Sequence, residues 1–206
     1  MKNSFYVPLL VLAFFLPQHA SATMITFNNW IHDGGSDPAD YIVNVDDETT
    51  GYLTFDISVN TTSLPDADLF GFFFDANDKL DSTNTTITGA DVSGVDFDTL
   101  SCGGNGCNLN GLTNDPFDVA VRLQDSGSSG GNLTWSNFTV MLVSTLSLYD
   151  IDRVGIRAQS SGLDGNGSDK ALSSIGTIKV PEPAPLALIG AGLVVMFGFS
   201  RKVRRP

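Results

Sequence analysis

The alternation of apolar and polar residues is the clearest pattern in the middle of the chain. Between residues 51 and 59, apolar side chains occupy every second position, and residues 117–124 repeat this pattern. Successive side chains of a strand point to opposite faces, so both segments predict strands with one buried face. In the second segment the inward residues are predicted to be Phe117, Val119, Val121 and Leu123. Residues 69–74 are apolar or Gly throughout and predict a strand buried on both faces.

Further strands are predicted from shorter or less regular patterns. Residues 133–143 predict a strand in which the change of phase between Trp135 and Phe138 indicates a β-bulge. Weaker patterns predict strands at 24–30, 41–45, 86–95, 154–158 and 174–179, and a single helical turn at 146–151. Loops rich in Gly, Asn, Asp and Ser separate these segments. The fold class predicted is all-β: one antiparallel β-sandwich or jelly-roll-like domain over residues 23–180.

The first 22 residues have the features of an export signal. Lys2 supplies a positive start, residues 5–16 are almost entirely apolar, and Ala20-Ser21-Ala22 provides small residues for cleavage. The apolar run is too short for a transmembrane helix. We therefore predict a signal peptide over 1–22, with cleavage between Ala22 and Thr23.

The C-terminal region contains three segments in a fixed order. Val180 leads into Pro181, Glu182 and Pro183, in which the prolines restrict the backbone. Residues 184–200 are almost entirely apolar and, as a helix, would span about 26 Å of a hydrocarbon core about 30 Å thick. Basic residues follow and are expected to stay in the cytoplasm: Arg201, Lys202, Arg204 and Arg205.

These three segments resemble the PEP-CTERM sorting signal of bacterial surface and secreted proteins. The resemblance covers residues 181–206, with the motif at 181–183, the transmembrane span at 184–200 and the basic tail at 201–205. It implies an exosortase as partner and a transient anchor in the inner membrane. It also implies cleavage near the motif, followed by a location at the cell surface or outside the cell.

The charge of the predicted domain excludes one class of partner. Residues 23–180 contain six Lys and Arg against 22 Asp and Glu, a net charge of −16. No basic patch is left to neutralise phosphates, so nucleic acid is not expected to bind. A strongly acidic surface keeps an exported protein soluble.

The cysteine and histidine content limits the chemistry that the domain could perform. Cys102 and Cys107 are the only cysteines, and in an exported chain they predict a disulfide that shapes one short loop. Zinc would need more ligands than these. His32 is the only histidine after residue 22, and the Gly/Ser segment 127–131 lacks the helix that a nucleophile elbow requires. The sequence therefore predicts a protein that is not an enzyme.

Two polar segments carry the alternatives that remain. Asp164, Asn166 and Asp169 are weak candidates for a calcium site, and residues 75–79 are a second candidate. Both segments lack parts of an EF-hand loop, and an ordinary turn is the preferred interpretation of each. Without calcium, no cofactor is expected. Asp46, Asp47 and Glu48 are the candidates for a glycoside hydrolase, which commonly needs two carboxylates. A solvated turn is the preferred interpretation of this acidic cluster.

Three functions therefore remain in order of preference. The first is a non-enzymatic, exosortase-sorted surface or matrix protein that associates with exopolysaccharide. The second is a lectin-like carbohydrate-binding module, with or without calcium, because segments 116–119 and 162–170 resemble small lectin-like β-sandwiches. Its binding loops would be among 101–114, 126–132 and 160–168, beside exposed aromatic residues among Trp30, Tyr41, Tyr52, Trp135 and Tyr149. The third is the Asp-based hydrolase.

Overall fold

The computed structural model describes residues 23–33, 38–60, 67–103, 106–124, 133–142, 146–161, 167–174 and 176–179. These residues belong to one compact unit, 22–181. In the described part of the chain, no helix has the length and hydrophobicity needed to cross a bilayer. The predicted signal peptide and the predicted span at 184–200 lie outside the described residues.

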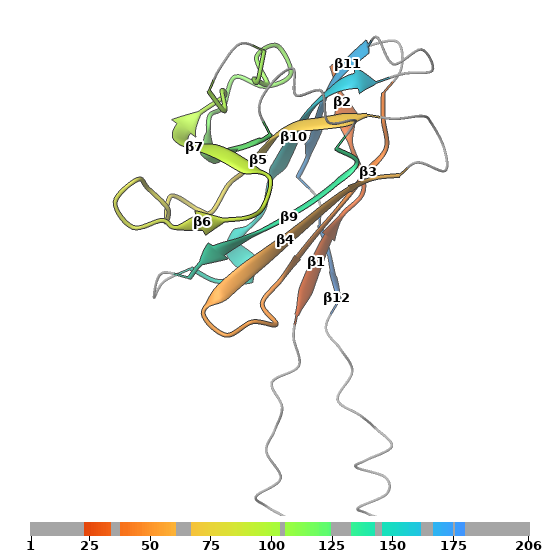
Figure 1. Cartoon of the computed structure of the whole chain (residues 1–206). Coiled ribbons are helices and arrows are strands. Elements are labelled where there is room, and N and C mark those ends of the chain that lie inside the picture. The colour runs from red at the N-terminus through yellow and green to blue at the C-terminus, as the bar shows by residue number, and fades with distance from the viewer. Residues whose placement is uncertain are drawn as a thin grey trace, which may run out of the picture. The chain divides into compact units, whose positions relative to one another are not determined.

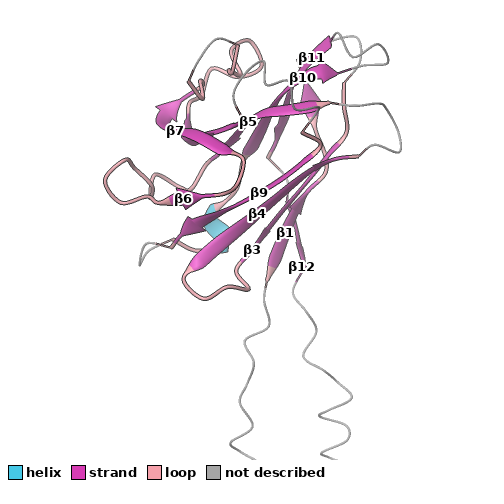
Figure 2. Ribbon diagram, in the orientation of Figure 1, coloured by secondary structure: helices cyan, strands magenta, loops and turns pink. Residues whose placement is uncertain are grey.

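The unit consists of two antiparallel sheets of six strands each (Figures 1 and 2). The first sheet has the order β12-β1-β3-β4-β9-β6, and the second has the order β2-β11-β10-β5-β8-β7. The strands of the first sheet are β12 (Gly176–Lys179), β1 (Met24–Phe27), β3 (Tyr41–Asp46), β4 (Tyr52–Val59), β9 (Trp135–Met141) and β6 (Ile87–Thr88). Those of the second are β2 (Ile31–His32), β11 (Gly167–Ser173), β10 (Val154–Ser161), β5 (Asp68–Phe74), β8 (Phe117–Leu123) and β7 (Val92–Thr99). The predicted all-β class and antiparallel pairing are confirmed.

Phenylalanines from both sheets form the centre of the main core. Phe55 of β4 lies 4.7 Å from Phe74 of β5 and 4.9 Å from Phe138 of β9, measured between ring centroids. Phe72 of β5 lies 5.7 Å from Phe138. These four rings are fully buried or nearly so, and they join the two sheets across one shared core. The alternating segment at 51–59 became β4 with the predicted residues buried.

The second sheet is also covered on its other face. Phe70 and Phe73 of β5 pack in a separate cluster with Cys102, Cys107 and Leu109 of the loop between β7 and β8. The prediction that 69–74 is buried on both faces is therefore confirmed. Other members of this cluster are Phe117 and Ala120 of β8. Phe117 was predicted to face inward with Val119, and its place in this second cluster corrects that prediction.

The disulfide loop lies against the strand beneath it without a side chain in between. Cys102 and Cys107 are a pair at disulfide distance, with Cα atoms 5.4 Å apart. A Cβ atom at Gly71 would overlap both sulfur atoms. Glycine at this position therefore leaves the space that the buried cysteine pair occupies.

Two local predictions were wrong, and strand β11 was missed, for identifiable reasons. Strand β9 pairs with β4 in unbroken register, so it contains no bulge: Trp135 is half exposed, and the small Ser136 takes the inward position. The strand predicted at 86–95 is two strands on different sheets, β6 and β7, separated at residues 89–91. Strand β11 was not predicted, because Gly167–Ser173 contains buried Asp169 where a strand pattern would have an apolar residue. The predicted turn at 146–151 is confirmed as the 3-10 turn η2 (Leu148–Asp150).

The first and last strands of the unit pair with each other. Met24 of β1 lies opposite Lys179 of β12, and on its other side opposite Asp46 of β3. The chain therefore enters and leaves this unit at neighbouring points. Both cores and all described strand pairings lie within 23–179, so we expect residues 22–181 to fold on their own.

Replacing Gly71 by Ala tests the contact between β5 and the disulfide. We expect Gly71→Ala to lower the free energy of unfolding by about 1–3 kcal/mol, because the added methyl group overpacks a filled site. In a Cys102→Ala/Cys107→Ala background the sulfurs are absent, and the same change should cost less than half as much. Urea unfolding of residues 22–181 measures all four proteins of this cycle. Equal costs in both backgrounds would contradict the assignment.

Candidate functional site

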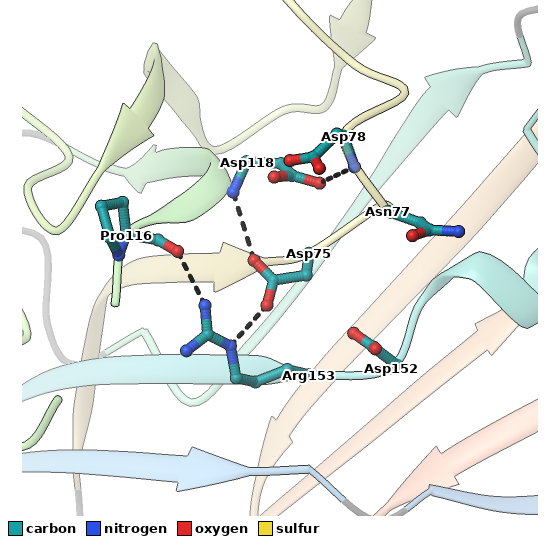
Figure 3. Close-up of a pocket in the computed structure, with 7 residues that line it drawn as sticks. All are labelled: Asp75, Asn77, Asp78, Pro116, Asp118, Asp152 and Arg153. Carbon is teal, nitrogen blue, oxygen red and sulfur yellow. Dashed lines mark hydrogen bonds and ion pairs between the residues drawn. The ribbon is translucent and has the colours of Figure 1, made fainter. Parts of the chain in front are cut away.

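A polar pocket of about 210 Å³ lies where three neighbouring strands of the second sheet begin or end (Figure 3). One wall is the end of β5 and the turn after it, a second is the start of β8, and a third is the segment before β10. The lining residues are Asp75, Asn77, Asp78, Pro116, Asp118, Asp152 and Arg153. The pocket therefore combines four carboxylates with one guanidinium group.

Asp118 shapes the turn that follows β5. Its Oδ2 accepts hydrogen bonds from the backbone N–H groups of Ala76 at 2.7 Å and Asp78 at 2.9 Å. Asn77 and Asp78 both have φ of 57°, a left-handed conformation that Asn and Asp tolerate better than most residues. Oδ2 of Asp118 therefore holds this turn in place.

Arg153 joins the three walls of the pocket. Its Nε donates to Asp75 Oδ2, and its Nη2 donates to the carbonyl oxygen of Pro116 at 2.7 Å. The guanidinium carbon lies 4.2 Å from the centre of the Phe117 ring, within the range of a cation–π contact. Burial raises the pKa of Asp75, and the ion pair with Arg153 opposes this increase. The guanidinium is fixed in place, as a binding site requires.

An aromatic residue lies next to this polar pocket. A second pocket, of about 270 Å³, is lined by Ile25, Tyr149, Ile151, Asp152, Ser174, Gly176 and Ile178. Asp152 lines both pockets, so the two adjoin. Tyr149 is 62% exposed and Ile178 is 50% exposed. An exposed aromatic face beside carboxylates and a guanidinium group suits a ligand that has both apolar faces and hydroxyl groups.

The turn that carries Tyr149 is held by its neighbour Asp150. Oδ2 of Asp150 accepts hydrogen bonds from Ser147 N at 2.7 Å and Ser147 Oγ at 2.8 Å, and Oδ1 accepts one from Lys79 Nζ at 2.7 Å. Burial alone would raise the pKa of Asp150, but the hydrogen bonds from Lys79 and Ser147 outweigh it and lower the pKa to about 2.

Of the three residues predicted as a calcium site, the structure describes only Asp169. Asp164 and Asn166 lie outside the described residues, whereas Asp169 lies in β11 and is 2% exposed. Asp169 accepts hydrogen bonds from Tyr41 Oη at 2.8 Å and from the backbone N–H of Ala39 at 3.1 Å, and it lies 3.0 Å from Nδ1 of His32. Burial raises the pKa of the Tyr41 hydroxyl, and the charge of Asp169 raises it further. Both carboxylate oxygens of Asp169 are therefore used within the protein.

In the other proposed calcium segment, residues 75–79, charged side chains also form ion pairs within the protein. Asp75 is paired with Arg153, and Lys79 with Asp150. Among the described residues, no group of three or more His, Cys, Asp or Glu side chains could hold a metal ion.

The acidic cluster proposed for a hydrolase consists of Asp46, the last residue of β3, and of Asp47 and Glu48 in the exposed turn that follows. Oδ1 of Asp46 accepts a hydrogen bond from the backbone N–H of Glu48 at 3.1 Å, and Oδ1 of Asp47 accepts one from the backbone N–H of Thr23 at 2.7 Å. Thr23 is the first described residue, one position before β1 begins. The predicted cleavage after Ala22 would thus leave β1 complete.

The candidate loops and aromatic residues are found in different environments. Loop 126–132 lies outside the described residues, and residues 160–161 and 167–168 belong to β10 and β11. Loop 101–114 covers the second sheet with buried Cys102, Cys107 and Leu109. Tyr41 is fully buried and Trp30 donates to its carbonyl oxygen, whereas Trp135 and Tyr149 are exposed. Tyr52 is half-buried.

The sequence did not point to Asp118, Asp152 or Arg153 as site residues. Asp118 is the second residue of β8, and Asp152 and Arg153 lie just before β10. Polar residues at the ends of strands are common in an acidic β protein. The available signal was the scarcity of basic residues, with six Lys and Arg over residues 23–180. With so many carboxylates around it, each of these Lys and Arg residues is expected to pair with one.

Comparison with known proteins gives one result. Residues 179–205 match the family model of the PEP-CTERM protein-sorting motif. No curated protein and no solved structure matches the chain. The match confirms the C-terminal resemblance, and the motif implies export and exosortase-mediated sorting from a membrane-anchored state. The motif residues Pro181, Glu182 and Pro183, the tail Arg201, Lys202, Arg204 and Arg205, and Ala22 lie outside the described residues.

The lowered pKa of Asp150 predicts a loss of stability in acid. Its pKa is about 2 in the folded protein and about 3.9 in an unfolded chain. The stabilisation is therefore fully present above the unfolded pKa and is lost as pH falls from about 4 to about 2. We expect Asp150→Asn to remove this part of the pH dependence of the unfolding midpoint. Lys79→Met should reduce the same slope, and an unchanged slope in Asp150→Asn would contradict this role.

Proposed function

We propose that this chain is an exported, exosortase-sorted protein of the cell surface or extracellular matrix, and that its β-sandwich binds exopolysaccharide. The export part is supported by the sorting motif at 179–205. The binding part rests on one observation, the position of exposed Tyr149 beside a pocket of fixed carboxylates and a guanidinium group, with Asp152 common to both.

The chemistry of the two adjoining pockets fits a saccharide. Sugar rings have apolar C–H faces that stack on aromatic rings, and their hydroxyl groups donate to carboxylates and accept from guanidinium groups. Asp75 and Arg153 already hold each other, which fixes their remaining donors and acceptors. Binding at this site needs no covalent step, and the proposed role is not that of an enzyme.

The acidic surface favours a neutral, hydroxyl-rich polymer over an anionic one as the ligand. The net charge of −16 over residues 23–180 repels polyanions at low salt. The proposed ligand is therefore a polysaccharide with few carboxylate or sulfate groups. During sorting the partners would be the exosortase and, transiently, the inner membrane.

Replacing Tyr149 tests the proposed binding site. We expect Tyr149→Ala to weaken binding to host exopolysaccharide at least about tenfold, because a central aromatic contact is lost. Trp135→Ala is the matched control, since Trp135 is also an exposed aromatic residue (50%) but lines neither pocket. Co-sedimentation of residues 22–181 with the polymer measures both variants. If Trp135→Ala loses binding and Tyr149→Ala retains it, the assignment of the binding site to Tyr149 is wrong.

A chelator separates the proposed site from the calcium alternative. The affinity of binding through Tyr149, Asp152 and Arg153 should change less than about twofold in EDTA, because the proposed contacts involve no metal ion. A tenfold loss in EDTA would instead favour the loop that contains Asp164 and Asn166.

Mass spectrometry of the mature protein tests the proposed route. In the native host, we expect cell-associated or released protein whose last peptide ends near Pro183 and which lacks residues 184–206. An intact C-terminal segment in the membrane fraction of an exosortase-competent host would overturn sorting by cleavage. This result would leave the saccharide-binding test unaffected.

A further inference from the structure

The start of β1 contacts the acidic turn between β3 and β4. The last registered pair between β1 and β3 is Met24 with Asp46. One residue beyond this pair, the backbone N–H of Asp47 donates to the carbonyl oxygen of Thr23 at 3.4 Å. The backbone N–H of Thr23 donates in turn to Oδ1 of Asp47 at 2.7 Å. The Asp47 side chain thus extends the hydrogen bonding between β1 and β3 to Thr23, the first residue of the predicted mature chain.

Signal peptide cleavage would change the chemistry of this contact. Hydrolysis of the bond between Ala22 and Thr23 adds the hydroxyl of a water molecule to the Ala22 carbonyl carbon and its hydrogen to the Thr23 nitrogen. Near neutral pH the new α-amine takes up a further proton and becomes an ammonium group. The nitrogen that lies 2.7 Å from the Asp47 carboxylate would then carry a positive charge.

We propose that Asp47 is the binding site for the α-ammonium group of the mature chain, and that processing replaces the neutral amide donor of this hydrogen bond by a charged one, which forms an ion pair that anchors β1. When the donor is charged as well as the carboxylate, Coulomb attraction adds to the hydrogen bond. This assigns a role to an acidic turn that lies apart from the polar pocket. The inference rests on the proposed export of the chain and not on saccharide binding.

Charges on both neighbouring strands affect the new ammonium group. The end of β3 supplies Asp46, the turn after it supplies Asp47 and Glu48, and β12 supplies Lys179, which lies opposite Met24. Asp46 is engaged by the N–H of Glu48, so Asp47 provides the direct contact. The three carboxylates favour the protonated amine, and the positive charge of Lys179 opposes them. The turn is exposed, so the effect is modest.

Competitive acetylation tests this proposal, because only the neutral amine reacts. The protein is residues 23–181 with a free Thr23 amine, and acetylation of the N-terminal peptide by limiting acetic anhydride is followed against pH. We expect an α-amine pKa about half a unit above the ordinary value of about 7.7–8.0. Asp47→Asn should remove most of this increase, whereas Glu48→Gln should remove little of it. High salt should reduce the increase in the wild-type protein.

Two results would overturn the proposal. One is an α-amine with the same pKa in the wild-type protein and in Asp47→Asn, with both shown to be folded by circular dichroism. The other is a mature chain isolated from the host that begins at a residue other than Thr23, which N-terminal sequencing would reveal. A chain extended by one Gly before Thr23 serves as the matched control, and its α-amine should show no dependence on Asp47.

Discussion

Burial of β5 on both faces is the constraint on which the rest of the structure depends. Phe72 and Phe74 pack against the first sheet, and Phe70 and Phe73 pack against the disulfide loop. A strand with large aromatic side chains on both faces needs cover on both sides, since exposing either face would leave apolar surface in water. The loop that closes the outer face connects Thr99 of β7 to Phe117 of β8 and is rich in Gly. It covers the strand because its two cysteines lie over Gly71 and its Leu109 lies over Gly155 of the neighbouring β10.

The few basic residues of the acidic domain hold loops to this framework. Arg157 is 8% exposed and donates to the carbonyl oxygens of Gly106, Ala158 and Asp169, which joins the disulfide loop to β10 and β11. Arg153 does the same between β5 and β8, and Lys79 fixes the turn with Asp150. Lys170 donates to the carbonyl oxygen of Asn110 at 2.5 Å. The polar pocket is thus formed by contacts that also keep the connections of the second sheet in place.

The sequence predicted those elements whose side chains follow the period of a strand. Strand β4 was predicted because its alternation is uninterrupted, and β5 because residues 69–74 are apolar or Gly throughout. The prediction failed where a buried position is polar: Ser136 is buried in β9 and bonded to Asp91, and Asp169 is buried in β11 and bonded to Tyr41. Such positions are stable only because a distant residue supplies a partner, and that information is not local. The same limit applies to the site. Residues 75–78 were recognised as polar, but their pairing with Arg153 and Asp118 depends on how the strands are ordered in the sheet.

The pairing of β1 with β12 has a consequence for the order of events during export. A chain that crosses the membrane from its N-terminus delivers β1 first and β12 last, and the first sheet has no complete edge until Lys179 has emerged. Contacts between residues so distant in sequence form slowly, since the entropy of closing the intervening chain must be overcome. The pairing of β1 with β12 is thus the contact in this sheet that needs the whole of residues 24–179 to be present. The match to the sorting motif begins at residue 179, where β12 ends, so the pairing that completes this edge of the sheet lies directly before the motif in the chain.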